Sequence, residues 1–324
     1  RDCLLSRGLG DVYKRQDPYW PKKAQEGCPE DIVPCLRCSN CYHISTDHWN
    51  VGCSVNPRYH NEAFVPSERE LEKAEKSKQV VILGGGPAGM KAAITASDRG
   101  HKVTLIEKSA ELGGMLKVIV REEHKEEVQR LLTWYKTQIA KREIKVLLNT
   151  EATPDMVREM KPDSILIALG AVERVLPIPG IDNPKVLLAT DAITHPEKLG
   201  DKVAILGGGS IGCEIALGLA EQGKEATVIE VTDTLAANAN SLYREALRQK
   251  FLLHDNIHSL TRCGCTRIDD EEIHYKDADG QEKVIAYDNL ILSTGLVPQI
   301  ALTESFYGIC RDTIAIGDCI RPSS

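Results

Sequence analysis

The residues with the clearest chemical potential are four cysteines in the stretch PCLRCSNCYHISTDHWNVGCSVNP, residues 34–57. Cys35, Cys38, Cys41 and Cys53 follow the spacing C-x2-C-x2-C-x11-C. A short loop that carries three thiolates, with a distant fourth, is typical of a cubane [4Fe–4S] cluster. Structural zinc sites more often use two separated C-x2-C pairs. The spacing therefore favours an iron–sulfur cluster, with a zinc site and simple free thiols as the alternatives.

Other potential ligands in the chain fit this cluster less well. His43 and His48 lie inside the loop and are expected to face solvent or to neighbour the site without binding metal. Cys28 breaks the spacing and is left outside the ligand set. Cys263 and Cys265 are separated by one residue on an expected strand, which disfavours a redox pair. The remaining cysteines are expected to be small apolar packing residues: Cys213, Cys310 and Cys319.

A sequence repeat follows the cysteines. VVILGGGPAGMKAAITASDRGHKVTLIEK at residues 80–108 aligns without a gap with VAILGGGSIGCEIALGLAEQGKEATVIEV at residues 203–231. Each copy predicts a buried strand, a tight turn, a helix that ends near a glycine, and a second strand. The glycines permit a sharp turn, close approach of a pyrophosphate, and tight packing of the helix on the strand. The helix N-terminus then offers free N–H groups to the phosphates.

An acid 23 residues after the first glycine completes each copy and would accept hydrogen bonds from an adenosine ribose. Two complete copies predict two dinucleotide sites. The predicted contacts in the first copy are Gly84, Gly86, Pro87, Ala88, Gly89 and Glu107. Those in the second copy are Gly207, Gly209, Ser210, Ile211, Gly212 and Glu230. Because Glu230 would repel a 2′-phosphate and EVTDTL offers no arginine to receive one, we expect NADH to be preferred over NADPH.

Composition restricts the remaining function classes. The 324 residues are 42% hydrophobic and 27% charged, as in ordinary globular proteins. The net charge of −7 argues against a nucleic-acid surface. We find neither a signal peptide nor an apolar run long enough for a transmembrane helix, so we expect a cytoplasmic protein with no membrane partner. In that compartment, the 11 cysteines point to metal or redox use.

The order of the later segments resembles the flavoprotein reductases that have two dinucleotide-binding domains. The matching segments are SAELGGML, a charged helix at about residues 122–142, KVLLN, SILIALGA, NLILSTGLVP and TIAIGDC. The resemblance implies an α/β fold with two Rossmann-like domains, the first for FAD and the inserted second for the nicotinamide cofactor. It also implies further FAD contacts at Gly114, Ala168, Gly170, Gly295, Gly317 and Asp318. The redox-active cysteine pair that many of these enzymes carry after the first copy is absent from this sequence.

The cysteine spacing, Asn56-Pro57 and the following VVILGGGPAGMKAA together resemble the NADH:flavin oxidoreductases of the old yellow enzyme group. That group includes 2,4-dienoyl-CoA reductase, bile-acid enoyl reductases and trimethylamine dehydrogenase. The resemblance implies an NADH-dependent enzyme that passes electrons through FAD and [4Fe–4S] to FMN in an N-terminal barrel. The barrel would bind a small unsaturated substrate and reduce its activated C=C bond. Because the cofactors carry this chemistry, no side chain is assigned a catalytic role.

The ends of the chain indicate a fragment that lacks the barrel. The opening RDCLLSRGLGDVYKRQ resembles a translated sequencing adapter. We expect the following organisation: residues 1–16 an artefact, 17–66 the cluster segment, 67–78 a solvated linker, 79–198 and 291–324 the FAD domain, and 199–290 the NAD(H) domain. Two other functions stay open. One is a reductase like the small subunit of glutamate synthase, although that family carries cysteines for two clusters. The other is a non-catalytic NADH-binding module with a zinc knuckle.

Overall fold

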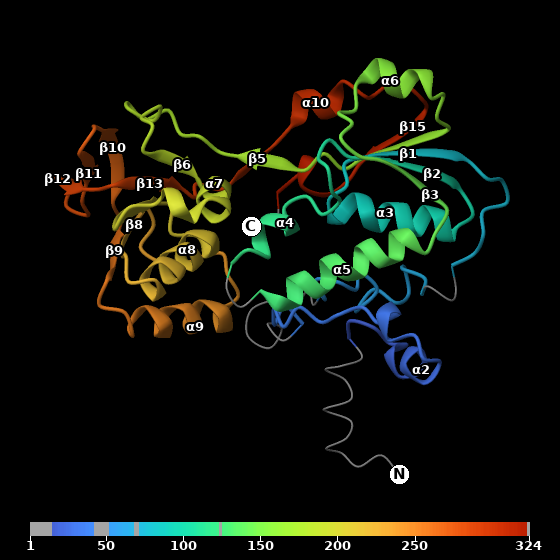
Figure 1. Cartoon of the computed structure of the whole chain (residues 1–324), viewed down its shortest axis with the longest axis horizontal. Helices are drawn as coiled ribbons and strands as arrows, with labels where there is room; N and C mark the ends of the chain where they lie inside the picture. Colours follow the sequence, from blue (N-terminus) through green and yellow to red (C-terminus); the bar gives the residue numbers. More distant parts are fainter. Residues whose placement is uncertain (1–14, 42–51, 68–70, 123–124, 323–324) are drawn as a thin grey trace, which may run out of the picture. The chain divides into compact units, whose positions relative to one another are not determined.

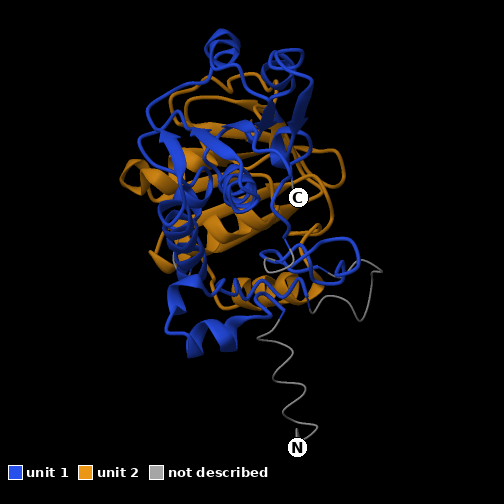
Figure 2. Ribbon diagram, turned by 90° about the vertical axis from the view of Figure 1, so that its right-hand side faces the viewer, with its two compact units in different colours: residues 1–120, 124–170, 298–322 blue, residues 121–123, 171–297, 323–324 orange. Residues whose placement is uncertain are grey.

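The computed structural model describes residues 15–41, 52–67, 71–122 and 125–322, and the chain divides into two compact units (Figure 1; Figure 2). The first unit comprises residues 1–120, 124–170 and 298–322. The second comprises residues 121–123, 171–297 and 323–324. Each unit is built on a five-stranded parallel sheet with helices packed on it. The predicted α/β class with two Rossmann-like units is thus confirmed.

The sheet of the first unit has the order β15-β4-β1-β2-β3, and all of its neighbouring strands are parallel. Its strands are β1 (Gln79–Leu83), β2 (Lys102–Ile106), β3 (Ile144–Leu147), β4 (Ser164–Ile167) and β15 (Asp312–Ala315). After the exposed Gln79, the four remaining residues of β1 are all buried. A continuous apolar run of this kind is expected for a parallel strand that is covered on both faces.

Helices cover both faces of this sheet (Figure 1). On one face, α3 (Pro87–Asp98) and α5 (Glu126–Ala140) enclose a core that includes Met90, Ile94 and Leu131. On the other face lie α6 (Pro154–Glu159) and α10 (Ile300–Glu304). Val157 of α6 and Phe306, which follows α10, are fully buried in the core on this face. Two short helices complete the unit: α4 (Leu116–Ile119) and the 3-10 helix η4 (Gly317–Cys319).

The sheet of the second unit has the order β6-β13-β7-β8-β9 and is also parallel. Its strands are β6 (Val186–Leu188), β7 (Lys202–Leu206), β8 (Glu225–Glu230), β9 (Ile257–Thr261) and β13 (Asn289–Leu292). Three helices and a 3-10 helix belong to this unit: α7 (Ala189–Thr194), η3 (Pro196–Lys198), α8 (Ser210–Glu221) and α9 (Ser241–Phe251). An apolar core of α7 and α8 side chains lies against β7, β8 and β13.

Two small sheets complete the second unit. The antiparallel sheet consists of β10 (Gly264–Ile268), β11 (Glu272–Lys276) and β12 (Glu282–Ala286). Its buried Ile268 and Ile273 share a core with Ala204 and Leu206 of β7. The second small sheet pairs β5 (Ala171–Glu173) with β14 (Leu296–Pro298) at the two points where the chain changes unit.

The cysteine segment belongs to the first unit and packs against α5. It begins with α2 (Trp20–Gln25) and the 3-10 helix η1 (Pro29–Asp31). Val33 is buried in the α3–α5 core, and Leu36 packs against it. The carbonyl oxygen of Asp31 accepts a 3.2 Å hydrogen bond from the Trp134 indole, and its carboxylate accepts one of 2.7 Å from Gln138. These contacts fix the segment to the helix.

The structure divides the chain at other positions than the sequence boundaries of 198/199 and 290/291. The unit boundaries that correspond to these two lie at 170/171 and 297/298. The reason is strand pairing: β6 pairs with β13, and β13 pairs with β7, so residues 186–188 and 289–292 belong to the second sheet. In the expected linker, the described residues 71–78 contain no helix.

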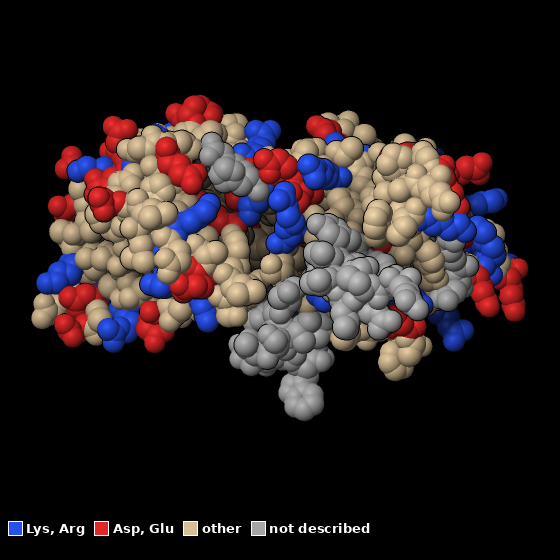
Figure 3. Space-filling view, turned by 90° about the horizontal axis from the view of Figure 1, so that it is seen from below, with Lys and Arg blue, Asp and Glu red and all other residues tan. Residues whose placement is uncertain are grey.

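Surface charge is mixed on the face seen in Figure 3. Among the described residues there, basic and acidic side chains are interspersed, and the basic ones form no continuous stripe of the kind that binds nucleic acid. No helix among the described residues is both long and apolar enough to span a bilayer.

Candidate functional site

The first glycine of each repeat makes the turn out of the strand. Gly84 has a φ of +102° and Gly207 one of +108°, a region that residues with a side chain rarely adopt. A Cβ atom at Gly84 would overlap the carbonyl oxygen of Ala168, and one at Gly207 would overlap that of Ser293. Both turns therefore require glycine for the same two reasons, the backbone angle and the neighbouring strand end.

The third glycine of each repeat brings the helix close to the turn. A Cβ atom at Gly89 would overlap the carbonyl oxygen of Gly84, and one at Gly212 would overlap that of Gly207. Both glycines are buried in the first turn of their helices, α3 and α8. Tight packing of helix against strand is thus the physical role of this position in both copies.

The second glycines face open space. Gly86 and Gly209 have extended backbones, and no atom lies within 4 Å of a Cβ at Gly209, while a Cβ at Gly86 would meet only the Gly114 Cα at 3.9 Å. They precede α3 and α8, whose N-termini have no side-chain cap. The helices begin at Pro87 and Ser210. The backbone N–H groups of these ends are therefore available to a pyrophosphate.

The two acids hold the glycine turns. Glu107 is buried, and its carboxylate accepts hydrogen bonds from the backbone N–H groups of Gly85 at 2.7 Å and Ser109 at 2.8 Å. Glu230 accepts the equivalent bonds from Gly208 at 2.6 Å and Thr232 at 2.7 Å. A carboxylate offers about four lone-pair positions, so each acid retains capacity for a ribose hydroxyl.

Sequence reasoning missed the hydroxyl residue two positions after each acid. The Ser109 hydroxyl donates to Glu107 at 2.5 Å and accepts a 2.9 Å hydrogen bond from Lys117. Its counterpart Thr232 donates instead to the carbonyl oxygen of Thr234 at 3.0 Å. Extending the alignment of the two copies by one residue could have found this position. It orders the loop that follows each acid.

Two more of the predicted FAD contacts lie against the first glycine turn. A Cβ atom at Gly114, where φ is +52°, would be 2.9 Å from the Cα of Gly86. At the start of η4, where φ is +70°, a Cβ at Gly317 would be 3.0 Å from the Cβ of Ala88. Asp318 follows Gly317 in η4 and is half-buried. The structure thus gathers residues from three distant parts of the chain around the start of α3.

The two predicted crossovers belong to different units. Ala168 to Gly170 follow β4 in the first unit, whereas Ser293 to Gly295 follow β13 in the second. Gly170 and Gly295 have positive φ angles of +70° and +90°. Gly295 was expected in the second part of the FAD domain. This placement is corrected, because Ser293 lies against Gly207 just as Ala168 lies against Gly84.

The cysteine loop has an unusual backbone. Arg37 and Ser39 have φ angles of +51° and +59°, although neither is glycine. Left-handed residues in a turn are one component of the backbone concavities that bind anions at iron–sulfur sites. The Arg37 N–H donates to the sulfur of Cys35 at 3.4 Å. Such N–H···S bonds are one of the protein's means of tuning a cluster.

The fourth cysteine lies close to this loop. Burial raises the pKa of Cys53, and the nearby thiols of Cys41 and Cys38 raise it further. The Cys38 sulfur is 3.2 Å from the hydroxyl of Ser54, the residue after Cys53. All four predicted ligands are free thiols and are exposed or half-buried. His43 and His48 lie outside the described residues.

Zinc and iron–sulfur sites differ in the spacing that they require between the ligand sulfurs. A tetrahedral zinc ion with Zn–S bonds of about 2.3 Å holds its sulfurs roughly 4 Å apart. Among the described residues, the four cysteines contain no group of three whose sulfurs lie within 4.8 Å of one another. In a cubane, each thiolate binds a different iron, so the sulfurs stand farther apart. Three of these described thiols would therefore have to approach one another to bind a single zinc ion.

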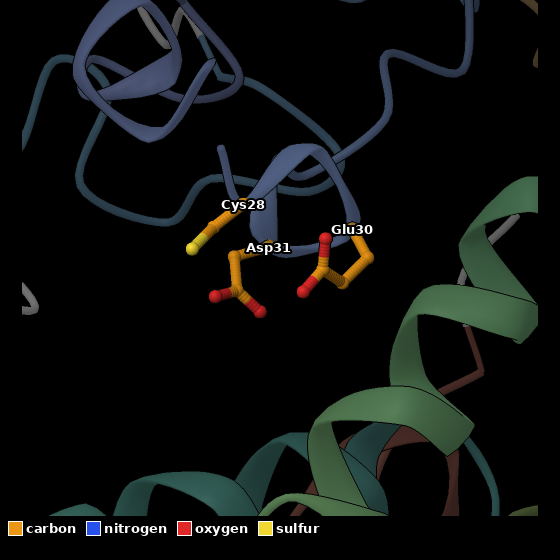
Figure 4. Close-up of side chains that lie close together, drawn as sticks. All are labelled: Cys28, Glu30 and Asp31. Carbon is orange, nitrogen blue, oxygen red and sulfur yellow. The ribbon is translucent and has the colours of Figure 1, made fainter. Parts of the chain in front are cut away.

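A second group of potential ligands, Cys28, Glu30 and Asp31, converges beside η1 (Figure 4). The ammonium group of Lys141 lies 2.7 Å from Glu30 and 2.7 Å from Asp31. The hydrogen bond from Lys141 lowers the pKa of Glu30. Burial raises the pKa of Asp31, but the hydrogen bonds from Lys141 and Gln138 together lower it by more, so the net shift is downward. Lys141 already binds both carboxylates, so this cluster attaches the segment to α5.

The cysteines outside the loop are poorly suited to redox chemistry. Burial raises the pKa of Cys213 to about 12 and that of Cys265 to about 11. Cys263 and Cys319 are buried. A thiol with a raised pKa stays protonated near neutral pH and reacts slowly.

The profile of the family described as "Pyridine nucleotide-disulphide oxidoreductase" matches residues 78–318. The chain belongs to this family. As a member it is an oxidoreductase, and the family implies FAD and a pyridine nucleotide as its cofactors. The matched range covers both glycine turns, both acids and Asp318, and it excludes the cysteine loop.

Three relatives extend the comparison. Cinnamate reductase from Clostridium sporogenes is 39% identical over 220 residues, which are 68% of this chain and 32% of the relative. Bilirubin reductase from Mediterraneibacter gnavus is 29% identical, in an alignment that covers 98% of this chain and 50% of that protein. A solved 2-naphthoyl-CoA reductase complex has a TM-score of 0.89 and 36% identity over 96% of this chain and 47% of that one. The chain thus spans half or less of these relatives, and they confirm the resemblance to the old yellow enzyme-like reductases.

Proposed function

We propose that this chain is the electron-input module of an NADH-dependent flavin and iron–sulfur oxidoreductase. Electrons from NADH would reach FAD in the first unit and continue to a [4Fe–4S] cluster on Cys35, Cys38, Cys41 and Cys53. An FMN-bearing barrel, which is not among these residues, would then reduce an activated C=C bond of an enoate or enoyl-CoA. The names of the related cinnamate and 2-naphthoyl-CoA reductases support this substrate class.

The observation that carries the proposal is that α5 holds both the cysteine segment and the loop of the predicted FAD site. On one side, Trp134 and Gln138 donate to Asp31 of the cysteine segment. On the other side, Leu132 is so close to Gly113 that a Cβ atom there would lie 2.9 Å from the leucine Cδ1. One rigid helix therefore keeps the two proposed sites in a constant relationship.

The residues of the first unit bind and orient FAD in this proposal. FAD supplies the change from two-electron hydride transfer to one-electron transfer, which no side chain can perform. The open N-terminus of α3 and the bare backbone at Gly86 and Gly114 would receive the pyrophosphate. Glu107 would hold the adenosine ribose, and Asp318 would contact the ribityl or pyrophosphate part.

The second unit would bind the nicotinamide cofactor in the same way. The backbone N–H groups at Ser210 and Ile211 would face the pyrophosphate, and the side chain of Ile211 is 47% exposed. Glu230 would accept the ribose hydroxyls and repel a 2′-phosphate, which favours NADH. No side chain is assigned as an acid or base, because hydride transfer requires orientation rather than proton transfer.

The cytoplasm is the proposed location. Ten cysteines are described, and every one of them is a free thiol. A reducing compartment keeps thiols in this state and also supplies NADH.

Metal analysis of anaerobically purified protein tests the proposal. We expect about four irons and four sulfides per chain. Cys38→Ser should reduce the iron content strongly, whereas the control Cys28→Ser should leave it unchanged. Zinc without iron would instead support the NADH-binding module with a zinc knuckle. About eight irons per chain would support the glutamate synthase-like alternative with two clusters.

A further inference from the structure

An ion pair joins the cysteine loop to the first turn of α5. Arg37, between Cys35 and Cys38, contacts the carboxylate of Glu127 through its guanidinium group. The two residues are 90 positions apart in the sequence. The Glu127 side chain is only 10% exposed, whereas that of Arg37 is 72% exposed. A mostly buried carboxylate on the helix thus meets an exposed cation from the loop.

The location of Glu127 explains why it can bind Arg37. It lies in the first turn of α5, where the helix dipole stabilises a negative charge. A buried carboxylate is costly unless a cation or hydrogen-bond donors compensate it. The Arg37 guanidinium supplies the opposite charge through the ion pair, although the Glu127 Oε1 that faces it accepts no hydrogen bond within the described part of the chain. Loss of the ion pair would therefore remove one attachment of the loop and leave the buried carboxylate without a cation.

The backbone of Arg37 is left-handed, with a φ of +51°, and needs contacts such as the ion pair to hold it there. A left-handed conformation at a residue with a side chain is unfavourable and persists only where contacts on several sides fix it. Two contacts fix Arg37: its N–H donates to the Cys35 sulfur, and its side chain binds Glu127. The turn that orients Cys35 and Cys38 is therefore anchored by the ion pair of Arg37 with α5, in addition to the apolar packing of Leu36 on the α3–α5 core.

We propose that Glu127 is a positioning residue for the cluster loop, which it holds in its binding conformation through Arg37. The inference rests on the proposed function and deepens it. Glu127 touches no proposed ligand itself. Its effect would be to keep the Cys35–Cys38 turn closed around the cluster and to place one compensated positive charge beside it.

Iron release and reduction potential test this role in the full chain. Outer contacts of metal ligands typically change affinity by about tenfold or more, so Glu127→Gln and Arg37→Ala should each accelerate iron loss to a ferrous chelator about tenfold. Arg37→Lys keeps the positive charge, so this variant should lose iron at a rate close to that of the wild type. The matched control is Glu111→Gln, which removes the ion pair of Lys136, on the same helix but away from the loop.

The reduction potential separates this role from a merely structural one. Arg37→Ala removes a positive charge and should lower the midpoint potential of the cluster, whereas Glu127→Gln removes a negative charge and should raise it. If both variants kept the iron retention and the cluster midpoint potential of the wild type, the inference would be overturned. Shifts of the same sign in both would also overturn it, because they would indicate general loosening of the loop.

Hydrogen exchange keeps the inference separate from the cluster assignment. In metal-free protein, the amides of residues 33–41 should exchange faster in Glu127→Gln than in wild type and in Glu111→Gln. Equal exchange in all three would contradict the inference. Wild-type protein that holds no iron but shows this difference would contradict the proposed cluster and retain the role of Glu127 in loop positioning.

Discussion

The carboxylate of Glu230 accepts a 2.6 Å hydrogen bond from the backbone N–H of Gly208, so the acid that would bind a ribose also holds the glycine turn. Glu107 stands in the same relation to Gly85 in the first unit. The acid and the phosphate-binding turn of each unit therefore form one hydrogen-bonded assembly. A change at either acid should affect cofactor binding through both of its roles.

The nicotinamide preference should depend on Glu230. Glu230→Gln removes the charge that binds the ribose diol and repels a 2′-phosphate. Hydrogen bonds to a charged group are worth about 2 kcal/mol, so we expect the KM for NADH to rise roughly tenfold or more. The KM for NADPH should change less or fall. Steady-state reduction of an artificial acceptor with both cofactors measures this, with Glu221→Gln at the exposed end of α8 as the control. Wild-type discrimination in Glu230→Gln would be inconsistent with this role.

Gly84 and Gly86 should respond differently to alanine. At Gly84 the methyl group would overlap the Ala168 carbonyl at a positive φ, so we expect a loss of stability of about 3 kcal/mol. At Gly86 the methyl group has room and the backbone is extended, so the fold should be retained while FAD is lost. Thermal unfolding and flavin content separate the two effects. Equal losses of stability in both variants would contradict the assignment.

The attachment of the cysteine segment to α5 should weaken in acid. The Lys141 contact lowers the pKa of Glu30, and for Asp31 the bonds from Lys141 and Gln138 outweigh burial, which raises it. Groups with a lowered pKa stabilise the folded state above their unfolded pKa of about 4, and this stabilisation is lost as pH falls through the folded-state value.

Thermal unfolding between pH 3 and pH 7 measures this attachment. Lys141→Met should lower the transition temperature at pH 7 and should show a smaller loss on acidification than wild type. Lys136→Met, which removes an ion pair of α5 elsewhere, is the control. An identical pH dependence of wild type and Lys141→Met would argue against the attachment.

Asp17 should be required for the structure of the cysteine segment. Its side chain, which is 3% exposed, accepts hydrogen bonds from the backbone N–H of Val33 at 3.0 Å and from Lys23 at 2.8 Å. Asp17→Ala would leave both donors without this partner, at a cost of about 3 kcal/mol. Limited proteolysis should then cleave the segment faster. Equal cleavage rates in Asp17→Ala and in Glu26→Ala, an exposed neighbour, would contradict this expectation.

The start of the cysteine segment bears on the expected artefact at residues 1–16. The structure describes two of these residues, Arg15 and Gln16. Arg15 donates to the carbonyl oxygen of Cys41 at 3.0 Å, and its own carbonyl accepts a 2.6 Å bond from Asn56. The assignment of residues 1–16 to an artefact stays a prediction that a longer sequence of this protein can test.

The sequence predicted those features that depend on neighbouring residues or on the repeat. Gly84 and Gly207 could be assigned because a strand, a glycine turn and a helix recur with the same spacing. The bonds from Gly85 to Glu107 were not anticipated, since a motif does not state which free backbone groups an acid will satisfy. The boundary at 170/171 and the Arg37–Glu127 pair depend on contacts between distant segments, for which a single sequence carries no periodic signal.

The most direct test is electron paramagnetic resonance of anaerobic, FAD-loaded protein after addition of NADH alone. The account predicts bleaching of the flavin band together with a reduced iron–sulfur signal of up to about one spin per chain. Cys38→Ser should lose the iron–sulfur signal and still show the bleaching. Flavin bleaching in the wild type without any iron–sulfur signal, although dithionite produces one, would contradict the proposed transfer of electrons from FAD to the cluster.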